Sequence, residues 1–219
     1  MSRGASLDAV FDLDGTLIDS APGIVRSIRH AYAEVDIEPP PFDDLRTWIG
    51  PPIRERLGTE LGSRGAEVVE VARSAFRAHY DAHGATGCEP FEGITELLAA
   101  LEISGARIAI ATSKPEPLAR AVLDDLGMAD RFVGVAAPAD GHTRVPKQEL
   151  LARLVSNPDQ LVGIPMIGDR RDDIHAGRHH EMRPIGVAWG YGSRDELIDA
   201  GAAAVVDHPF TLSQMIGDA

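Results

Sequence analysis

Two aspartates separated by one residue are the side chains of this sequence best placed to do chemistry together. Asp12 and Asp14 lie in the segment FDLDGTL at residues 11–17, at the end of a short apolar run. Residues two apart on an extended chain point to the same side. Two such carboxylates repel each other unless a cation lies between them, and Mg²⁺ prefers oxygen ligands of this kind. On its own, such a pair is more often an acidic turn that caps a helix.

Further polar residues favour the metal interpretation, because each follows its own apolar, strand-like run or the loop after one. Asp169 ends the segment MIGD at residues 166–169, and Asp173 lies four residues later, about one helical turn into the next segment. Thr112 and Ser113 end another apolar run, and Lys147 opens a predicted helix. Together these residues predict a site at one edge of a sheet that binds a metal ion and a phosphoryl group.

The elements that must position these residues alternate between two types. Short apolar runs indicate buried strands, and amphipathic segments of helical length separate them. The runs are 7–13, 106–112, 131–136, 164–167, 185–189 and 203–206, and the helical segments are 94–103, 116–126, 148–155, 172–180 and 194–200. Strands that are apolar throughout and alternate with helices predict an α/β fold with a doubly wound, mostly parallel sheet, a Rossmann-like core.

One long helical block interrupts this alternation. Residues 21–88 contain no convincing buried strand and predict helices at 23–33, 42–48, 52–61 and 66–83. A block of this size is too long for an ordinary crossover connection. We therefore expect an α/β core domain of residues 1–20 and 89–219, with residues 21–88 inserted as a small helical cap domain.

In this order the motifs resemble those of the haloacid dehalogenase superfamily of phosphohydrolases, and the resemblance covers nearly the whole chain. The segment DLDGT at residues 12–16 matches the first motif, Thr112 the second, Lys147 the third, and Gly168, Asp169 and Asp173 the fourth. The helical block is similar to the family's cap. Segments at 48–54, 140–144 and 189–193 are similar to the branch of phosphoglycolate phosphatases and 5′-nucleotidases. His180-Glu181 departs from that branch, in which a glycine usually occupies the second position.

The resemblance implies a role for each residue. Asp12 would be the nucleophile that forms an aspartyl phosphate, and Asp14 would protonate the leaving group and then activate water. Lys147, Thr112 and Ser113 would bind the phosphoryl group, and Asp173 would orient Lys147 or a metal-bound water.

A Mg²⁺ ion would be held by the Asp12 and Asp169 carboxylates and by the backbone carbonyl of Asp14. In the cap, Gly50 and Arg54 are the candidate substrate contacts, and Arg54 is equally typical of a solvated helix residue.

The implied activity is a Mg²⁺-dependent phosphatase of a small organic phosphomonoester, phosphoglycolate first among them. A 5′-nucleotidase acting on nucleoside monophosphates and a sugar phosphomutase are alternatives that share all four motifs. A non-catalytic binding protein on the same fold is disfavoured, because Asp12 and Lys147 are both present. Dehalogenation is disfavoured by the presence of Asp14.

Composition limits the partners. The 219 residues include 21 basic and 34 acidic ones, and the formal charge of −13 disfavours nucleic acid and anionic membranes as partners. A bound cation can still create a site for a phosphorylated metabolite. One cysteine, Cys88, and the lack of an apolar secretory run at the first residues predict a cytoplasmic protein. The sequence does not indicate an oligomeric state.

Overall fold

A computed structural model describes residues 6–140 and 145–217 of the chain. Its contacts divide the chain into two compact units. One comprises the residues as far as Ile18 together with those from Pro90 onward, and the other is Asp19–Glu89. The chain passes between the units through β2 (Ile18–Asp19) and β3 (Glu89–Pro90), which pair as a two-stranded sheet.

The first unit is built on a six-stranded sheet in the order β5-β4-β1-β6-β7-β8, and neighbouring strands in it are parallel. The strands are β1 (Ala9–Phe11), β4 (Ile108–Ala111), β5 (Gly134–Ala136), β6 (Pro165–Gly168), β7 (Arg183–Val187) and β8 (Ala204–Val206). The predicted α/β fold with a doubly wound parallel sheet is confirmed.

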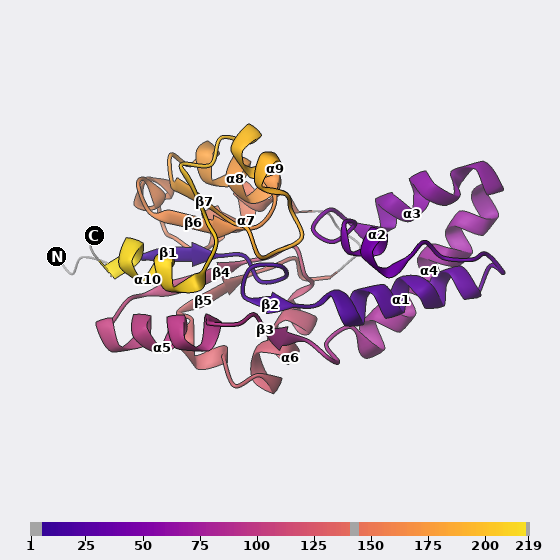
Figure 1. Ribbon diagram of the computed structural model, residues 1–219, viewed down its shortest axis with the longest axis horizontal. Helices are drawn as coiled ribbons and strands as arrows, with labels where there is room; N and C mark the ends of the chain where they lie inside the picture. Colours follow the sequence, from indigo (N-terminus) through magenta and orange to yellow (C-terminus); the bar gives the residue numbers. More distant parts are fainter. Residues whose placement is uncertain (1–5, 141–144, 218–219) are drawn as a thin grey trace. The chain divides into compact units, whose positions relative to one another are not determined.

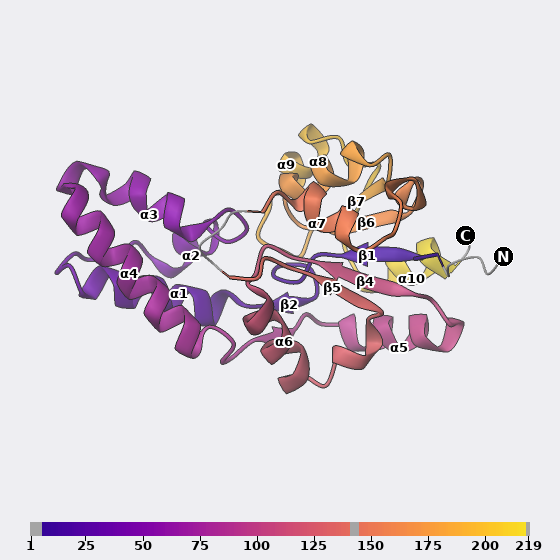
Figure 2. The ribbon, with the colours of Figure 1, turned by 180° about the vertical axis from the view of Figure 1, so that it is seen from behind.

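Helices cover both faces of this sheet. Figures 1 and 2 show α7, α8 and α9 on one face and α5, α6 and α10 on the other. Their bounds are α5 (Ile94–Ser104), α6 (Glu116–Asp125), α7 (Lys147–Arg153), α8 (Arg171–His179), α9 (Arg194–Asp199) and α10 (Pro209–Gly217), with short 3₁₀ turns at Ala129–Arg131 and Pro158–Leu161. The turn at Ala129–Arg131 corrects the prediction of a strand from residue 131, because the strand begins only at Gly134.

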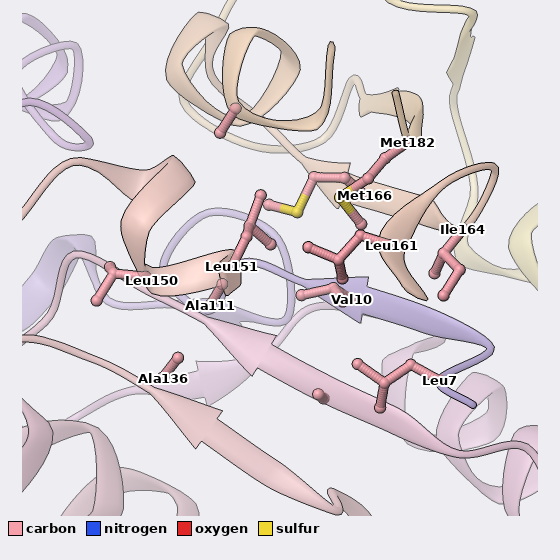
Figure 3. Packing of buried hydrophobic residues seen from close by; sticks show 12 residues of the cluster. Leu7, Val10, Ala111, Ala136, Leu150, Leu151, Leu161, Ile164, Met166 and Met182 are labelled. Atoms are coloured by element: carbon pink, nitrogen blue, oxygen red, sulfur yellow. The ribbon is translucent and has the colours of Figure 1, made fainter. Parts of the chain in front are cut away.

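The core under α7 and α8 fixes the face that each strand presents. Val10 of β1 and Met166 of β6 pack with Leu150 and Leu151 of α7, as Figure 3 shows. Alternation along a strand sends the neighbouring residues, such as Phe11, to the opposite face. Since the central strands are buried on both faces, their sequences are apolar throughout.

The second unit consists of helices. These are α1 (Ala21–Ala33), α2 (Phe42–Arg46), α3 (Ile53–Leu61) and α4 (Ala66–His83), with a 3₁₀ turn at Gly62–Arg64 between the last two. Helices α1 and α4 pack against each other, and both carry buried apolar side chains, including Ile28 of α1 and Phe76 of α4. No helix in the described parts of the chain is long and apolar enough to cross a membrane.

The unusual His180-Glu181 pair ends helix α8 in a Schellman motif. The amide of Met182 donates to the carbonyl of Gly177, and the amide of Glu181 donates to that of Arg178. This motif requires a left-handed residue, and Glu181 adopts it with φ 53°. The chain therefore places glutamate at a position where glycine has the lower conformational cost.

Candidate active site

Three buried carboxylates converge where strands β1 and β6 end. Asp12 follows β1, Asp169 follows β6, and Asp173 lies in the first turn of α8. Strands β1 and β6 are adjacent and parallel, with Phe11 beside Ile167, so their carboxyl ends reach the same edge of the sheet. One oxygen from each carboxylate lies within 4.8 Å of the others. The structure thus brings together three of the aspartates selected from the sequence.

Lys147 supplies a positive charge to this group. Its Nζ lies 2.9 Å from Asp12 Oδ1 and makes a short contact with Asp173 Oδ1. Burial lowers the pKa of the lysine, but the carboxylates of Asp12 and Asp173 outweigh burial and raise it above its ordinary value. Lys147 therefore stays charged beside the predicted nucleophile.

Asp173 has both carboxylate oxygens engaged by the protein. Oδ1 accepts from Lys147 Nζ, and Oδ2 accepts a 2.9 Å hydrogen bond from the amide of Arg170. A side chain at Gly168 would overlap the Asp173 carboxylate, so the glycine of this motif leaves room for it. This arrangement suits a residue that orients Lys147.

The Asp169 carboxylate is enclosed by the loop after β7. Its Oδ2 accepts a 2.8 Å hydrogen bond from the amide of Tyr191, and a Cβ at Gly190 would lie 2.3 Å from Asp169 Cβ. The indole Nε1 of Trp189 donates to the carbonyl of Thr16 over 3.0 Å, which ties this loop to the one that follows Asp14. The sequence indicates this segment only through its family resemblance, and the structure adds these contacts with Asp169 and Thr16.

Burial makes the ionised form of this cluster unfavourable. It raises the pKa of Asp169 to about 7, with the Asp173 charge adding to the effect. Burial also raises the pKa of Asp12 well above its ordinary value, although Lys147 opposes the shift. Asp12 Oδ1 is buried without a well-directed hydrogen bond. Clustered carboxylate oxygens with excess negative charge fit a hard divalent cation.

Asp14 has a partner that the sequence reasoning missed. The Nζ of Lys114 donates to Asp14 Oδ1 over 3.0 Å, and the lysine side chain is fully buried. The signal that could have found it is compositional. Of the 21 basic residues in the sequence, only Lys114 and Lys147 are lysines. Lys114 follows the apolar run that ends at residue 112, and Lys147 opens a predicted helix.

The remaining predicted residues fall into two groups. Thr112 is buried at the end of β4 and its Oγ1 accepts a 3.1 Å hydrogen bond from the amide of Lys114, whereas Ser113 is exposed. Gly50 and Arg54 belong to the second unit. Gly50 has φ 114°. The side chain of Arg54 is 54% exposed, and its Nη2 lies 3.4 Å from Glu70 Oε1.

Comparison with protein families identifies the family of the chain. Residues 9–187 match the family described as haloacid dehalogenase-like hydrolase. The chain belongs to this family. The resemblance that the motifs suggested is therefore confirmed, and the matched range includes Asp12, Lys147 and Asp169.

Three similar proteins carry different names. Tyrosine-protein kinase PtkA of Mycobacterium tuberculosis is 41% identical over 94% of this chain and 70% of its own length, and its structure superimposes with a TM-score of 0.80. A 5′-nucleotidase of Pseudomonas aeruginosa is 34% identical over 86% of this chain and 85% of its own. A phosphoglycolate phosphatase of Agrobacterium fabrum is 32% identical over 87% and 84%. This haloacid dehalogenase-like hydrolase is a phosphoric monoester hydrolase.

Proposed function

We propose that this chain is a Mg²⁺-dependent phosphatase of a small organic phosphomonoester that works through an aspartyl phosphate on Asp12. The observation that carries the proposal is the position of Asp12, which lies against Lys147 and within reach of the Asp169 carboxylate at one edge of the sheet. The names of the 5′-nucleotidase and the phosphoglycolate phosphatase support this class of substrate.

In the first half of the reaction, Asp12 attacks phosphorus and the ester P–O bond breaks. The leaving oxygen takes a proton from Asp14, two residues away. In the second half, Asp14 takes a proton from the water that attacks the aspartyl phosphate, which releases phosphate and restores Asp12. Lys147 offsets the negative charge between Asp12 and the phosphoryl group, and Asp173 holds Lys147 in place.

The carboxylates of Asp12 and Asp169 and the backbone carbonyl of Asp14 are the proposed Mg²⁺ ligands. The metal would supply a positive charge that neutralises the phosphoryl oxygens and favours in-line attack. Thr112 and Ser113 are proposed to contact the phosphoryl group at the end of β4.

The second unit is proposed to act as the cap that selects the substrate, through Gly50 and Arg54. Arg54→Ala should raise KM for phosphoglycolate severalfold and leave that for p-nitrophenyl phosphate nearly unchanged. Arg64→Ala is a matched control, because it removes an exposed charge from the 3₁₀ turn of the same unit. An equal change in both KM values would argue against a specificity role for Arg54.

The test of the proposed function is a turnover screen with Mg²⁺ and a panel of phosphoglycolate, nucleoside 5′-monophosphates and sugar phosphates. Free phosphate released from one class in preference to the others supports the proposal. A sugar phosphate that is isomerised without release of phosphate would favour a phosphomutase instead.

Phosphoryl transfer to a tyrosine is a second candidate activity, favoured by the name of the mycobacterial relative at 41% identity. Both activities can use the same phosphorylated Asp12, and they differ in the acceptor, which is water or a hydroxyl. Incubation with γ-labelled ATP and a tyrosine-containing polypeptide distinguishes them. Label in phosphotyrosine favours transfer, whereas label in free phosphate alone favours hydrolysis.

A further inference from the structure

Lys114 is one of the two lysines in the chain, and like Lys147 it is buried. Its side chain is 0% exposed, and it contacts a carboxylate that is 14% exposed. A buried ammonium group is costly unless a carboxylate compensates it. The compensating group here is Asp14, one hundred residues earlier in the sequence. The pair therefore belongs to the architecture of the site and not to a solvated surface.

The fold holds the backbone on both sides of this pair. Strands β1 and β4 are parallel neighbours, with Phe11 beside Ile110, so the loops that carry Asp14 and Lys114 leave adjacent strands. The amide of Lys114 donates to Thr112 Oγ1, which fixes the turn after β4. On the other side, the carbonyl of Leu13 accepts hydrogen bonds from the amides of residues 16, 17 and 18.

Because hydrogen bonds hold the backbone of both loops, the Asp14 carboxylate can change its position mainly by rotation about its side-chain torsions. An aspartate that transfers a proton must hold one oxygen near the leaving group and, later, near the attacking water. A contact of 3.0 Å from a buried ammonium group restricts where that carboxylate can point. Lysine suits this role because its compact ammonium group can bind a single carboxylate oxygen, whereas the planar guanidinium of arginine favours binding both oxygens.

Each of the two lysines thus contacts one of the two aspartates of the segment DLDGT. Lys147 contacts Asp12, and Lys114 contacts Asp14. We propose that Lys114 is a positioning residue that holds the Asp14 carboxylate in place for proton transfer to the leaving group and from water. This inference rests on the proposed function, since it assigns Asp14 the role of acid and base.

The consequence for the reaction is a dependence on the leaving group. When the P–O bond breaks, the electron pair stays on the ester oxygen, which takes the Asp14 proton. A p-nitrophenolate needs this proton little, because the nitro group stabilises its charge, whereas a phenolate needs it more. Phenyl phosphate and p-nitrophenyl phosphate therefore separate a loss of proton transfer from a general loss of structure.

The experiment compares kcat/KM for these two esters in wild type, Lys114→Met, Lys114→Arg and Asp14→Asn, all with Mg²⁺. Lys114→Met should reduce turnover of phenyl phosphate by about a hundredfold, the scale of general acid catalysis, and that of p-nitrophenyl phosphate by much less. Lys114→Arg should restore part of the loss. Asp14→Asn should show the same selectivity, and the double variant with Lys114→Met should lose little more.

Arg120→Met is the matched control, because it removes one positive charge from an exposed pair with Glu116 in the helix after Lys114. It should leave the ratio of the two rates unchanged. If Lys114→Met lowers kcat/KM equally for both esters, or if the losses in the double variant are fully additive, the positioning role alone is overturned. Wild-type protein that hydrolyses neither ester would overturn the proposed function as well.

A second readout does not depend on turnover. Protein labelled with ¹⁵N at the lysine Nζ should give signals from two residues, since the sequence has two lysines. Asp14→Asn should shift the Lys114 signal and leave that of Lys147 nearly in place. A Lys114 signal that is insensitive to Asp14→Asn would contradict the pair, even if Lys114→Met fails to fold.

Discussion

At the scale of single residues, the chemistry of this site follows from an imbalance of charge. Asp12, Asp169 and Asp173 are buried within a few ångströms of one another, and Lys147 contacts two of them. One ammonium group cannot neutralise three carboxylates. The excess negative charge favours a divalent cation, and the ammonium group of Lys147 favours the ionised, nucleophilic form of Asp12.

Replacing the nucleophile should therefore abolish activity without loss of the fold. Asp12→Asn keeps the size of the side chain and removes one buried charge, so the variant should fold and show no detectable hydrolysis of p-nitrophenyl phosphate. Circular dichroism and a phosphate-release assay measure the two properties. Wild-type turnover by a folded Asp12→Asn protein would contradict the aspartyl-phosphate mechanism.

The raised pKa of Asp169 predicts how stability depends on pH when no metal is present. Burial raises this pKa to about 7 in the folded chain, whereas aspartate in an unfolded chain titrates near about 3.9. Between these values the folded state binds more protons, so the free energy of unfolding should fall as pH rises from about 4 to about 7.

Thermal unfolding in EDTA at several pH values between 5 and 8 measures this effect. Asp169→Asn should flatten the dependence, and addition of Mg²⁺ to the wild type should restore stability near pH 8. If wild type and Asp169→Asn lose stability in parallel over this range, the titration belongs to other groups.

Sequence reasoning predicted Asp12, Asp14 and Asp169 because each follows an apolar run, and Lys147 because it opens a helix in a stretch poor in other cations. It missed Lys114 because that contact depends on the neighbouring placement of β1 and β4 and on the direction of a long side chain. It also missed the hydrogen bond from Trp189 to Thr16, which joins segments 173 residues apart. Patterns along the chain contain neither kind of information.

At the scale of elements, the sequence predicts that a strand or helix is present better than it predicts the residues at which the element begins and ends. The run at residues 131–136 has the apolar character of a strand, yet its first residue ends a 3₁₀ turn and the strand begins at Gly134. Helix starts are predicted more accurately than strand starts. The predicted start of α4 at residue 66, for example, is the observed one. Strand ends depend on which residues find a pairing partner, and that is a property of the sheet.

The backbone conformation at the end of helix α8 has an unfavourable free energy that a substitution can remove. Glu181 adopts φ 53°, a left-handed conformation that costs about 1–2 kcal/mol for a residue with a Cβ. Glycine avoids this cost and loses roughly 0.5–1 kcal/mol in chain entropy. Glu181→Gly should therefore stabilise the protein by about 1 kcal/mol, which raises Tm by about 2–4 °C at this chain length.

The matched control is Glu181→Ala, which removes the same carboxylate and keeps the Cβ. It should give no comparable gain in Tm. Equal stabilisation by alanine and glycine would attribute the effect to the lost charge and not to the backbone. Activity should be unaffected in both variants, since Glu181 contributes no side chain to the site.

At the scale of the whole molecule, the acidity of the chain determines the order in which ligands can bind. A formal charge of −13 attracts cations and repels a phosphate ester. The two lysines at the sheet edge are already paired with Asp12, Asp14 and Asp173, so they cannot by themselves offset that repulsion. A divalent cation at the carboxylates adds the positive charge that phosphate requires.

Inorganic phosphate should therefore bind detectably only after the metal. Calorimetric titration of phosphate into the protein in EDTA should give no measurable heat of binding, whereas the same titration with excess Mg²⁺ should give a saturable isotherm. Asp169→Asn is the control, because it removes a proposed metal ligand and should behave like the metal-free wild type. Since added salt screens the attraction between the acidic protein and the cation, Mg²⁺ affinity should fall with ionic strength. Phosphate binding of equal strength with and without Mg²⁺ would show that the protein's own cations are sufficient, and that the acidic cluster does not require a metal to accept an anion.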